Sequence, residues 1–173
     1  MENKVMRIIF VRHGDYKGNK LTRLGRKQAM LVCHSLKDEN IGRVYCSPIG
    51  RTVETANIIV KTLKLDAPII RKELTEREFL TGEPKNEAES QYAENYLNPS
   101  FSSDHPEGCK NFLERSFKFL DEISKLDFES ILIVGHSSFS YALTAYFTGV
   151  PKDKDLVWVR VGNCSKMCYE VKK

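Results

Sequence analysis

The sequence has no apolar run long enough to cross a membrane. Residues 131–134 are purely aliphatic, but they fall far short of the ~20 residues that a membrane helix needs. The first residues, MENKVMR, also lack the apolar region of a secretory signal. We therefore expect a cytoplasmic protein that makes no contact with a membrane.

Paired cysteines are also missing. The chain has five cysteines, an odd number, and none of them forms a C-x-x-C pair, which argues against a disulfide framework and against a zinc site. They are Cys33, Cys46, Cys109, Cys164 and Cys168. We interpret them as small buried hydrophobic residues of a protein from a reducing compartment.

The sequence also lacks a strong excess of charge of one sign. The chain has 27 Lys and Arg against 23 Asp and Glu, which gives a formal net charge of +4. The basic residues are scattered among the acidic ones, so they form no stripe of the kind that a nucleic-acid-binding protein needs. We therefore expect no nucleic-acid partner, and the mild positive charge favours small anionic ligands only weakly.

Strand and helix signals alternate along the chain. Short apolar runs predict strands at 8–11, 44–46, 69–70 and 131–134. Helical spacing of apolar residues predicts helices between and after them, the first capped by Thr22. This order is typical of an α/β fold. We expect a three-layer sandwich with a mostly parallel central sheet and helices on both faces.

The length of 173 residues predicts one domain over 1–173. Residues 74–111 are polar and show no long period, so we expect them to form a small cap over the active site. A helix from about residue 110 would turn Leu113, Phe117, Leu120 and Ile123 inward. The alternating segments 157–161 and 167–171 predict an antiparallel hairpin at the C-terminal edge of the sheet.

Two of the predicted strands end in a glycine and a histidine. Arg12-His13-Gly14 follows the first strand, and Gly135-His136 ends the run at 131–134. In an open α/β sheet the ligand site lies beyond the carboxyl ends of the strands, so we expect both histidines in one crevice. Arg51, at the start of a helix, would join them there. Arginine and histidine together suit a tetrahedral dianion, because the guanidinium fork matches phosphate oxygens.

These residues resemble a known family. Arg12-His13-Gly14 is similar to the R-H-G signature of the histidine phosphatase superfamily, which includes the cofactor-dependent phosphoglycerate mutases. Further segments resemble that family in the same order along the chain: Leu21-Thr22, Gly25 and Gln28-Ala29; Ser47-Pro48, Arg51 and Thr55-Ala56; Leu74 and Glu76; Gly135-His136; and Asn163-Cys164-Ser165. The resemblance covers nearly the whole chain and points to a compact phosphatase branch.

The resemblance implies a mechanism. His13 would be the nucleophile that forms a phosphohistidine, so that one difficult transfer becomes two easier ones. Arg12, Arg51 and His136 would hold the phosphate oxygens, with no metal and no other cofactor. Glu76 would be the general acid that protonates the leaving oxygen and later activates water.

Four further residues are secondary candidates. Glu78 is the alternative to Glu76 as general acid, because both lie in the charged segment 73–78. Lys17 and Asn19 would contact the phosphate or the leaving group from the loop after Gly14. Ser137 would offer its backbone N–H at the start of the helix that follows His136.

Departures from the family pattern favour hydrolysis. The loop between Gly14 and Leu21 is short, and 106–110 lacks the Glu and Ser that the family often has there. A mutase must keep water away from its phosphohistidine, whereas a lightly covered site admits water. We therefore expect a phosphomonoesterase acting on a small phosphorylated metabolite. The sequence leaves the oligomeric state open.

Three other functions remain as alternatives. The first is phosphotransfer of the phosphoglycerate mutase type, and the second is an inactive module that only binds phosphate. The third is a serine hydrolase, because the segment GHSSF at 135–139 begins like a G-x-S-x-G elbow. Phe139 occupies the closing glycine position of that motif, and a serine hydrolase would leave Arg12, His13 and Arg51 without a role.

Overall fold

The computed structural model describes residues 5–77, 109–149 and 161–173. The expected cap at 74–111 and the first strand of the expected hairpin at 157–161 therefore lie mostly outside the described residues. Glu78 also lies outside them.

The core of the molecule is a five-stranded sheet in the order β5-β4-β6-β1-β7. Its strands are β1 (Val5–Arg12), β4 (Ile41–Cys46), β5 (Ile69–Ile70), β6 (Ser130–Gly135) and β7 (Lys166–Lys172). Neighbouring strands run parallel from β5 to β1, and β7 pairs antiparallel with β1 at the edge. The expected mostly parallel sheet with an antiparallel C-terminal edge is confirmed.

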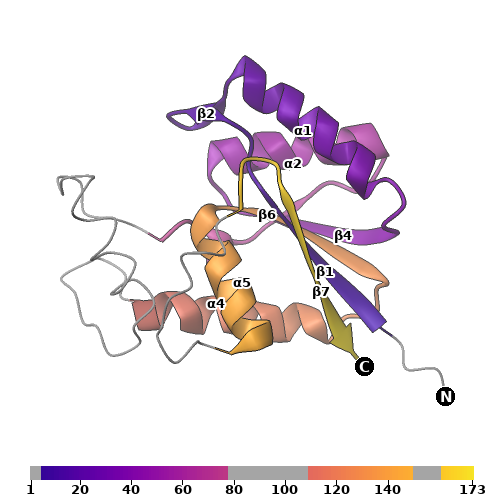
Figure 1. Ribbon diagram of the computed structural model, residues 1–173, viewed down its shortest axis with the longest axis vertical. Helices are drawn as coiled ribbons and strands as arrows, with labels where there is room; N and C mark the ends of the chain where they lie inside the picture. Colours follow the sequence, from indigo (N-terminus) through magenta and orange to yellow (C-terminus); the bar gives the residue numbers. More distant parts are fainter. Residues whose placement is uncertain (1–4, 78–108, 150–160) are drawn as a thin grey trace.

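Helices cover both faces of this sheet, as the sequence predicted (Figure 1). On one face lie α1 (Arg23–Leu36) and α2 (Gly50–Leu63), and on the other α4 (Cys109–Ser124) and α5 (Ser137–Thr148). Successive side chains of a strand point to opposite faces. Ile9 and Val11 accordingly pack with the first pair of helices, whereas Ile8 and Phe10 pack with the second pair.

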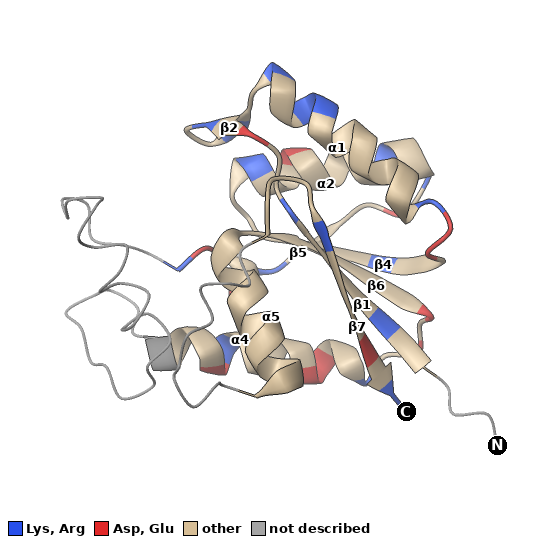
Figure 2. Cartoon of the chain, viewed as in Figure 1, with Lys and Arg blue, Asp and Glu red and all other residues tan. Residues whose placement is uncertain are grey.

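The central strand β6 is buried along its whole length. Each of its large aliphatic side chains contributes about 1.5–3 kcal/mol through burial. Helix α5 carries no charged residue, in keeping with its largely buried position, whereas α4 carries both signs (Figure 2).

Helix α4 turns inward the face that the sequence predicted, with Phe117 at its margin. Leu113, Leu120 and Ile123 are buried as expected, but Phe117 is only partly buried. Its ring contacts Tyr146 of α5, with ring centroids 5.4 Å apart. Phe112 and Phe119 of the same helix are fully buried.

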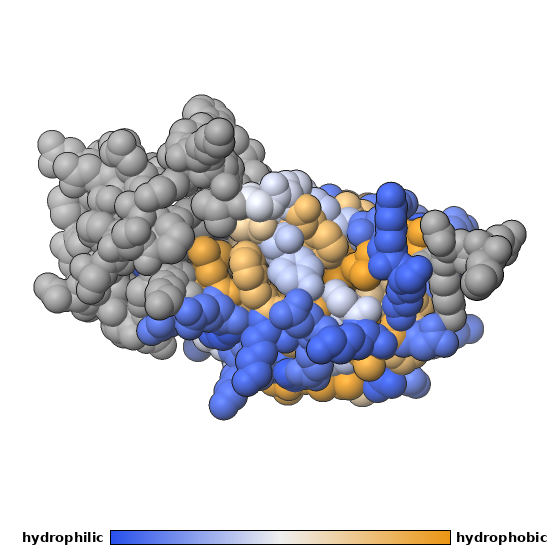
Figure 3. All heavy atoms as spheres, turned by 90° about the horizontal axis from the view of Figure 1, so that it is seen from below, coloured by the Kyte–Doolittle hydropathy of each residue, from blue (hydrophilic) through white to orange (hydrophobic). Residues whose placement is uncertain are grey.

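The face of the molecule seen from below in Figure 1 carries hydrophilic side chains with apolar side chains between them (Figure 3).

Cys33, Cys46 and Cys164 are free and buried as expected. The expectation is wrong for Cys168, which is free and exposed because it lies on the outward side of the edge strand β7. Within the described ranges, no helix has both the length and the apolar character needed to span a bilayer.

The strand register brings three strand ends to one edge of the sheet. Arg12 lies opposite Gly135, and Cys46 lies opposite Val134. The residues that follow these strands, His13, Ser47 and His136, therefore leave the sheet side by side. The backbone N–H of His13 donates to the Gly135 carbonyl at 3.0 Å, which fixes the nucleophile candidate against the end of β6.

Thr22 caps α1 as the sequence predicted, because its Oγ1 accepts a hydrogen bond from the backbone N–H of Gly25 at 3.1 Å. Replacing Thr22 by Ala removes this acceptor. We expect Thr22→Ala to lower the free energy of unfolding by about 1 kcal/mol in urea titrations. Thr22→Ser keeps the hydroxyl and should retain most of the stability. Equal stability of all three proteins would contradict the capping role.

Candidate active site

The imidazole of His13 has a defined orientation. Its Nδ1 lies 2.8 Å from the Gly14 carbonyl oxygen, which can only accept a hydrogen bond, so Nδ1 carries the proton. The Nε of Arg51 donates to Nε2 of His13 at 3.0 Å. The unprotonated nitrogen is therefore Nε2, and its electron pair accepts the hydrogen bond from Arg51.

Gly14 allows this arrangement because the chain is tightly packed there. A Cβ at Gly14 would lie 2.5 Å from the carbonyl oxygen of Gly25 in α1. A side chain at this position would push His13 away from the end of β6, which explains a glycine beside the histidine.

Arg51 connects the two histidines. It lies in the first turn of α2, and its Nη2 is 3.2 Å from Nδ1 of His136. Since a guanidinium only donates, Nδ1 of His136 accepts, and Nε2 donates to Ser47 Oγ at 2.9 Å. The ring of Tyr16 lies under the Arg51 guanidinium, 4.5 Å from its central carbon.

Arg12 approaches the site from the end of β1. Its Nη1 donates to the Val161 carbonyl at 3.1 Å, and its own carbonyl accepts from the N–H of Cys164 at 2.9 Å. The turn before β7 thus holds Arg12 next to His13.

Glu76 completes the cluster. Its Oε2 lies 3.4 Å from Nδ1 of His136. Its Oε1 accepts hydrogen bonds from the backbone N–H of Ser138, at 3.1 Å, and from the Ser138 hydroxyl. Arg115 of α4 supports this segment by donating to the carbonyls of Glu73 and Thr75.

Burial and positive charge keep both histidines neutral. Desolvation, aided by Arg51 and Arg12, lowers the pKa of His13 to about 4. Desolvation and Arg51 lower the pKa of His136 to about 2. Burial raises the pKa of the Glu76 carboxyl, opposed by its hydrogen bonds to Ser138. At neutral pH the cluster combines neutral imidazoles with guanidinium charge, which suits an anion.

The structure brings together the five main residues that the sequence predicted: Arg12, His13, Arg51, Glu76 and His136. It does not bring Lys17 into this cluster, because Lys17 is exposed in β2 (Tyr16–Lys17) of a short hairpin with β3 (Lys20–Leu21). Ser137 lies beside His136, and its Oγ is buried with no hydrogen-bond partner among the described residues.

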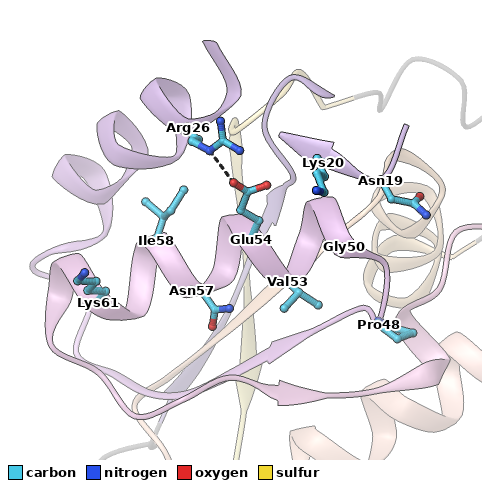
Figure 4. A pocket seen from close by; sticks show the side chains of 10 residues that line it. All are labelled: Asn19, Lys20, Arg26, Pro48, Gly50, Val53, Glu54, Asn57, Ile58 and Lys61. Carbon is cyan, nitrogen blue, oxygen red and sulfur yellow. Dashed lines mark hydrogen bonds and ion pairs between the residues drawn. The ribbon is translucent and has the colours of Figure 1, made fainter. Parts of the chain in front are cut away.

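Asn19 lies in a groove on the outer side of α2 (Figure 4). It stands beside Gly50, and a Cβ on Gly50 would meet the Asn19 carbonyl oxygen at 2.5 Å. An ion pair between Arg26 and Glu54 crosses the same groove at 2.6 Å. Asn19 thus packs against Gly50 at the start of α2, and Arg51 is the residue after Gly50.

One group of side chains has the composition of a metal site. Ligand atoms of His13, Glu76 and His136 lie within 4.8 Å of one another. The Arg51 guanidinium, however, contacts one ring nitrogen of each histidine, so a cation there would meet a fixed positive charge. The donor set fits a phosphate better than a metal ion.

Sequence reasoning missed three residues of this site. Ser47 and Ser138 bind the side chains of His136 and Glu76, and Tyr16 packs on Arg51. Ser47 lies in the matched segment Ser47-Pro48, which was the available signal. Ser138 and Tyr16 have no distinguishing pattern around them.

Two neutral histidines that follow parallel strands thus meet two arginines and a carboxyl group in an α/β protein, and the charge of this cluster suits an anion. The family model described as histidine phosphatase superfamily (branch 1) matches residues 8–173. The chain belongs to this superfamily, and the resemblance in the sequence is confirmed.

Two curated relatives are phosphatases by name. A probable phosphatase of Schizosaccharomyces pombe is 30% identical over 129 residues, which are 68% of this chain and 60% of that protein. The adenosylcobalamin/alpha-ribazole phosphatase of Escherichia coli is 27% identical over 167 residues, covering 86% of this chain and 82% of that protein. The family and these relatives together support a phosphatase enzyme.

The fold is shared with a solved phosphatase. The mycobacterial glucosyl-3-phosphoglycerate phosphatase matches with a TM-score of 0.79 at 19% identity, over 96% of this chain and 90% of that chain. A likeness at this identity shows the common fold.

The low pKa of His13 can be tested directly. We expect NMR titration of the His13 imidazole to give a midpoint near pH 4, well below the ordinary 6.5. Arg51→Gln removes a positive charge next to the ring, so the midpoint should rise, yet it should stay below 6.5 because burial is the larger cause. A midpoint near 6.5 in the wild type would show that the ring is not held neutral.

Proposed function

We propose that the protein is a metal-independent phosphomonoesterase that hydrolyses a small phosphorylated metabolite through a phosphohistidine on His13. The observation that carries the proposal is the tautomer of His13. Gly14 holds the proton on Nδ1 and leaves the Nε2 electron pair directed into a cluster of cationic donors. The family and the phosphatase relatives support the reaction class.

In the first step, Nε of Arg51 turns from Nε2 of His13 to a phosphate oxygen, Nε2 attacks phosphorus, and the bond from phosphorus to the leaving oxygen breaks. Glu76 gives its proton to that oxygen, so that a neutral alcohol departs. Arg12 and Arg51 hold the remaining phosphate oxygens, and His136, whose Nε2 hydrogen goes to Ser47, orients Arg51 through Nδ1. Both arginines stand beside His13 before the reaction, so the charge that moves onto these oxygens is stabilised with little reorganisation.

In the second step, water attacks the phosphohistidine. Glu76, now a carboxylate, takes a proton from the water while the bond between nitrogen and phosphorus breaks. Inorganic phosphate is released, and His13 and Glu76 return to their starting protonation states. The hydrogen bonds of Ser138 and the burial of the carboxyl act in opposite directions on Glu76, which suits a group that must both give and take a proton.

Hydrolysis is favoured over mutase chemistry by the hairpin at the site. The β2–β3 hairpin is the short loop seen in the sequence, and Tyr16 next to the cluster is 42% exposed. His13 itself is buried, so the support for hydrolysis comes from this short hairpin together with the phosphatase relatives. Three expectations remain predictions of the sequence. They are the cap formed by residues 74–111, the substrate contacts of Lys17, Asn19 and Ser137, and a cytoplasmic location.

The names of the relatives support a broad class of substrate rather than one particular substrate. The names of the Escherichia coli and mycobacterial proteins refer to small phosphorylated molecules. We propose the same broad class for this chain.

The nucleophile is tested by comparing wild type with His13→Asn on p-nitrophenyl phosphate, phosphoglycerates, sugar phosphates and nucleotides, all with EDTA. We expect wild-type phosphate release to survive EDTA and His13→Asn to lose at least about 10³-fold in kcat. The exposed His34 gives the matched control His34→Asn, which should retain activity. Turnover in a folded His13→Asn protein would disprove the proposed intermediate, and loss of wild-type activity in EDTA would disprove metal independence.

The general acid is tested through the leaving group. An alkoxide needs a proton to depart, whereas p-nitrophenolate does not. Glu76→Gln should therefore lower kcat about 10²- to 10⁴-fold on an alkyl phosphate and much less on p-nitrophenyl phosphate. Glu78→Gln is the comparison, since Glu78 is the alternative candidate. The reverse pattern, with Glu78→Gln showing the leaving-group dependence, would move the role to Glu78.

A further inference from the structure

Among the described residues, both hydrogen bonds to the Glu76 carboxyl group go to one oxygen. The backbone N–H of Ser138 donates to Oε1 at 3.1 Å, and the Ser138 hydroxyl donates to the same oxygen. The other oxygen, Oε2, lies on the side of His136, 3.4 Å from Nδ1. The two oxygens of this carboxyl group are therefore not equivalent.

The Ser138 hydroxyl is itself held in place. It accepts a hydrogen bond from the backbone N–H of Arg77 at 3.4 Å, so its own hydrogen is left for Glu76. Ser138 is 2% exposed and lies in the first turn of α5. Because Arg77 follows Glu76 directly, these contacts tie residues 76–77 to the start of α5.

The environment of Glu76 is otherwise cationic or neutral. Arg51 of α2 and Arg12 of β1 favour its charged form, and His136 at the end of β6 is kept neutral. Arg115 of α4 holds the neighbouring Thr75 carbonyl at 2.9 Å. Against these groups, burial favours the protonated form. The two hydrogen bonds from Ser138 therefore oppose the effect of burial, which raises the pKa of this carboxyl group.

We propose that Ser138 is a positioning residue that binds Oε1 of Glu76 and thereby directs the exchangeable proton to Oε2, facing the phosphate site. The inference rests on the proposed function and goes beyond it. A proton on Oε1 would compete with two donors, whereas a proton on Oε2 points toward the histidines and the leaving oxygen. Ser138 thus sets both the direction of proton transfer and the pH at which Glu76 can serve as an acid.

The test replaces Ser138 by Ala, which removes the hydroxyl and keeps the backbone N–H. Alanine is the better helix former, so the variant should fold. Ser140, in the same turn of α5 and also buried, gives the matched control Ser140→Ala. Two readouts are compared in the three proteins: the titration of the Glu76 carboxyl carbon by ¹³C NMR, and the pH profile of kcat/KM on an alkyl phosphate.

Loss of a donor to the carboxylate favours the protonated form. In Ser138→Ala we therefore expect the Glu76 midpoint and the basic limb of the pH profile to move up together by about one pH unit. On the plateau below the basic limb, where Glu76 is protonated in all three proteins, kcat on the alkyl phosphate should fall several-fold with KM little changed, because the misdirected proton affects the chemical step. Ser140→Ala should leave both readouts at the wild-type values.

Other results would overturn the inference. An unchanged Glu76 midpoint in Ser138→Ala, or an equal shift in Ser140→Ala, would show that the hydroxyl does not act on Glu76. The NMR titration needs no turnover, so it separates the two proposals. A raised midpoint in a protein that hydrolyses no phosphate ester would overturn the proposed function together with the role of Ser138 in it, whereas turnover with an unmoved midpoint would overturn the role of Ser138 alone.

Discussion

The site depends on one guanidinium group that lies between two histidines. Arg51 donates to His13 and contacts His136. The other ring nitrogen of His13 donates to the Gly14 carbonyl, and that of His136 donates to the Ser47 hydroxyl. Burial lowers the pKa of both rings, and the positive charge of Arg51 lowers it further. The same charge would attract a phosphate dianion, so one interaction would serve both the proposed nucleophile and the proposed binding site.

The fold makes this interaction possible through strand register. Parallel pairing of β1 and β4 with β6 aligns their carboxyl ends, and α2 begins close to that edge. Alternation of side chains along β1 provides the two apolar faces that α1, α2, α4 and α5 cover. The polar ends of the strands therefore stand on a rigid apolar sheet.

Much of this could be predicted from the sequence, because a strand that ends in glycine and histidine places the histidine at a known edge of the sheet. Arg51 could be predicted because it lies at the start of the helix that follows the strand at 44–46. The inward face of α4 could also be predicted from its apolar spacing, and Phe117 on that face packs at its margin against Tyr146 of α5. Ser138 could not be found, because its contact with Glu76 joins segments 62 residues apart.

The pairing of β1 with β6 also has a kinetic consequence. It joins Arg12 to Gly135, far apart along the chain, and His13 and His136 directly follow these partners. Contacts of such sequence separation carry a large loop-closure cost and slow folding. The two histidines meet only when the centre of the sheet has closed, so no partly folded chain that lacks this pairing has an assembled site. Regain of activity during refolding would consequently time the closure of the sheet centre, whereas recovery of helical signal alone would not.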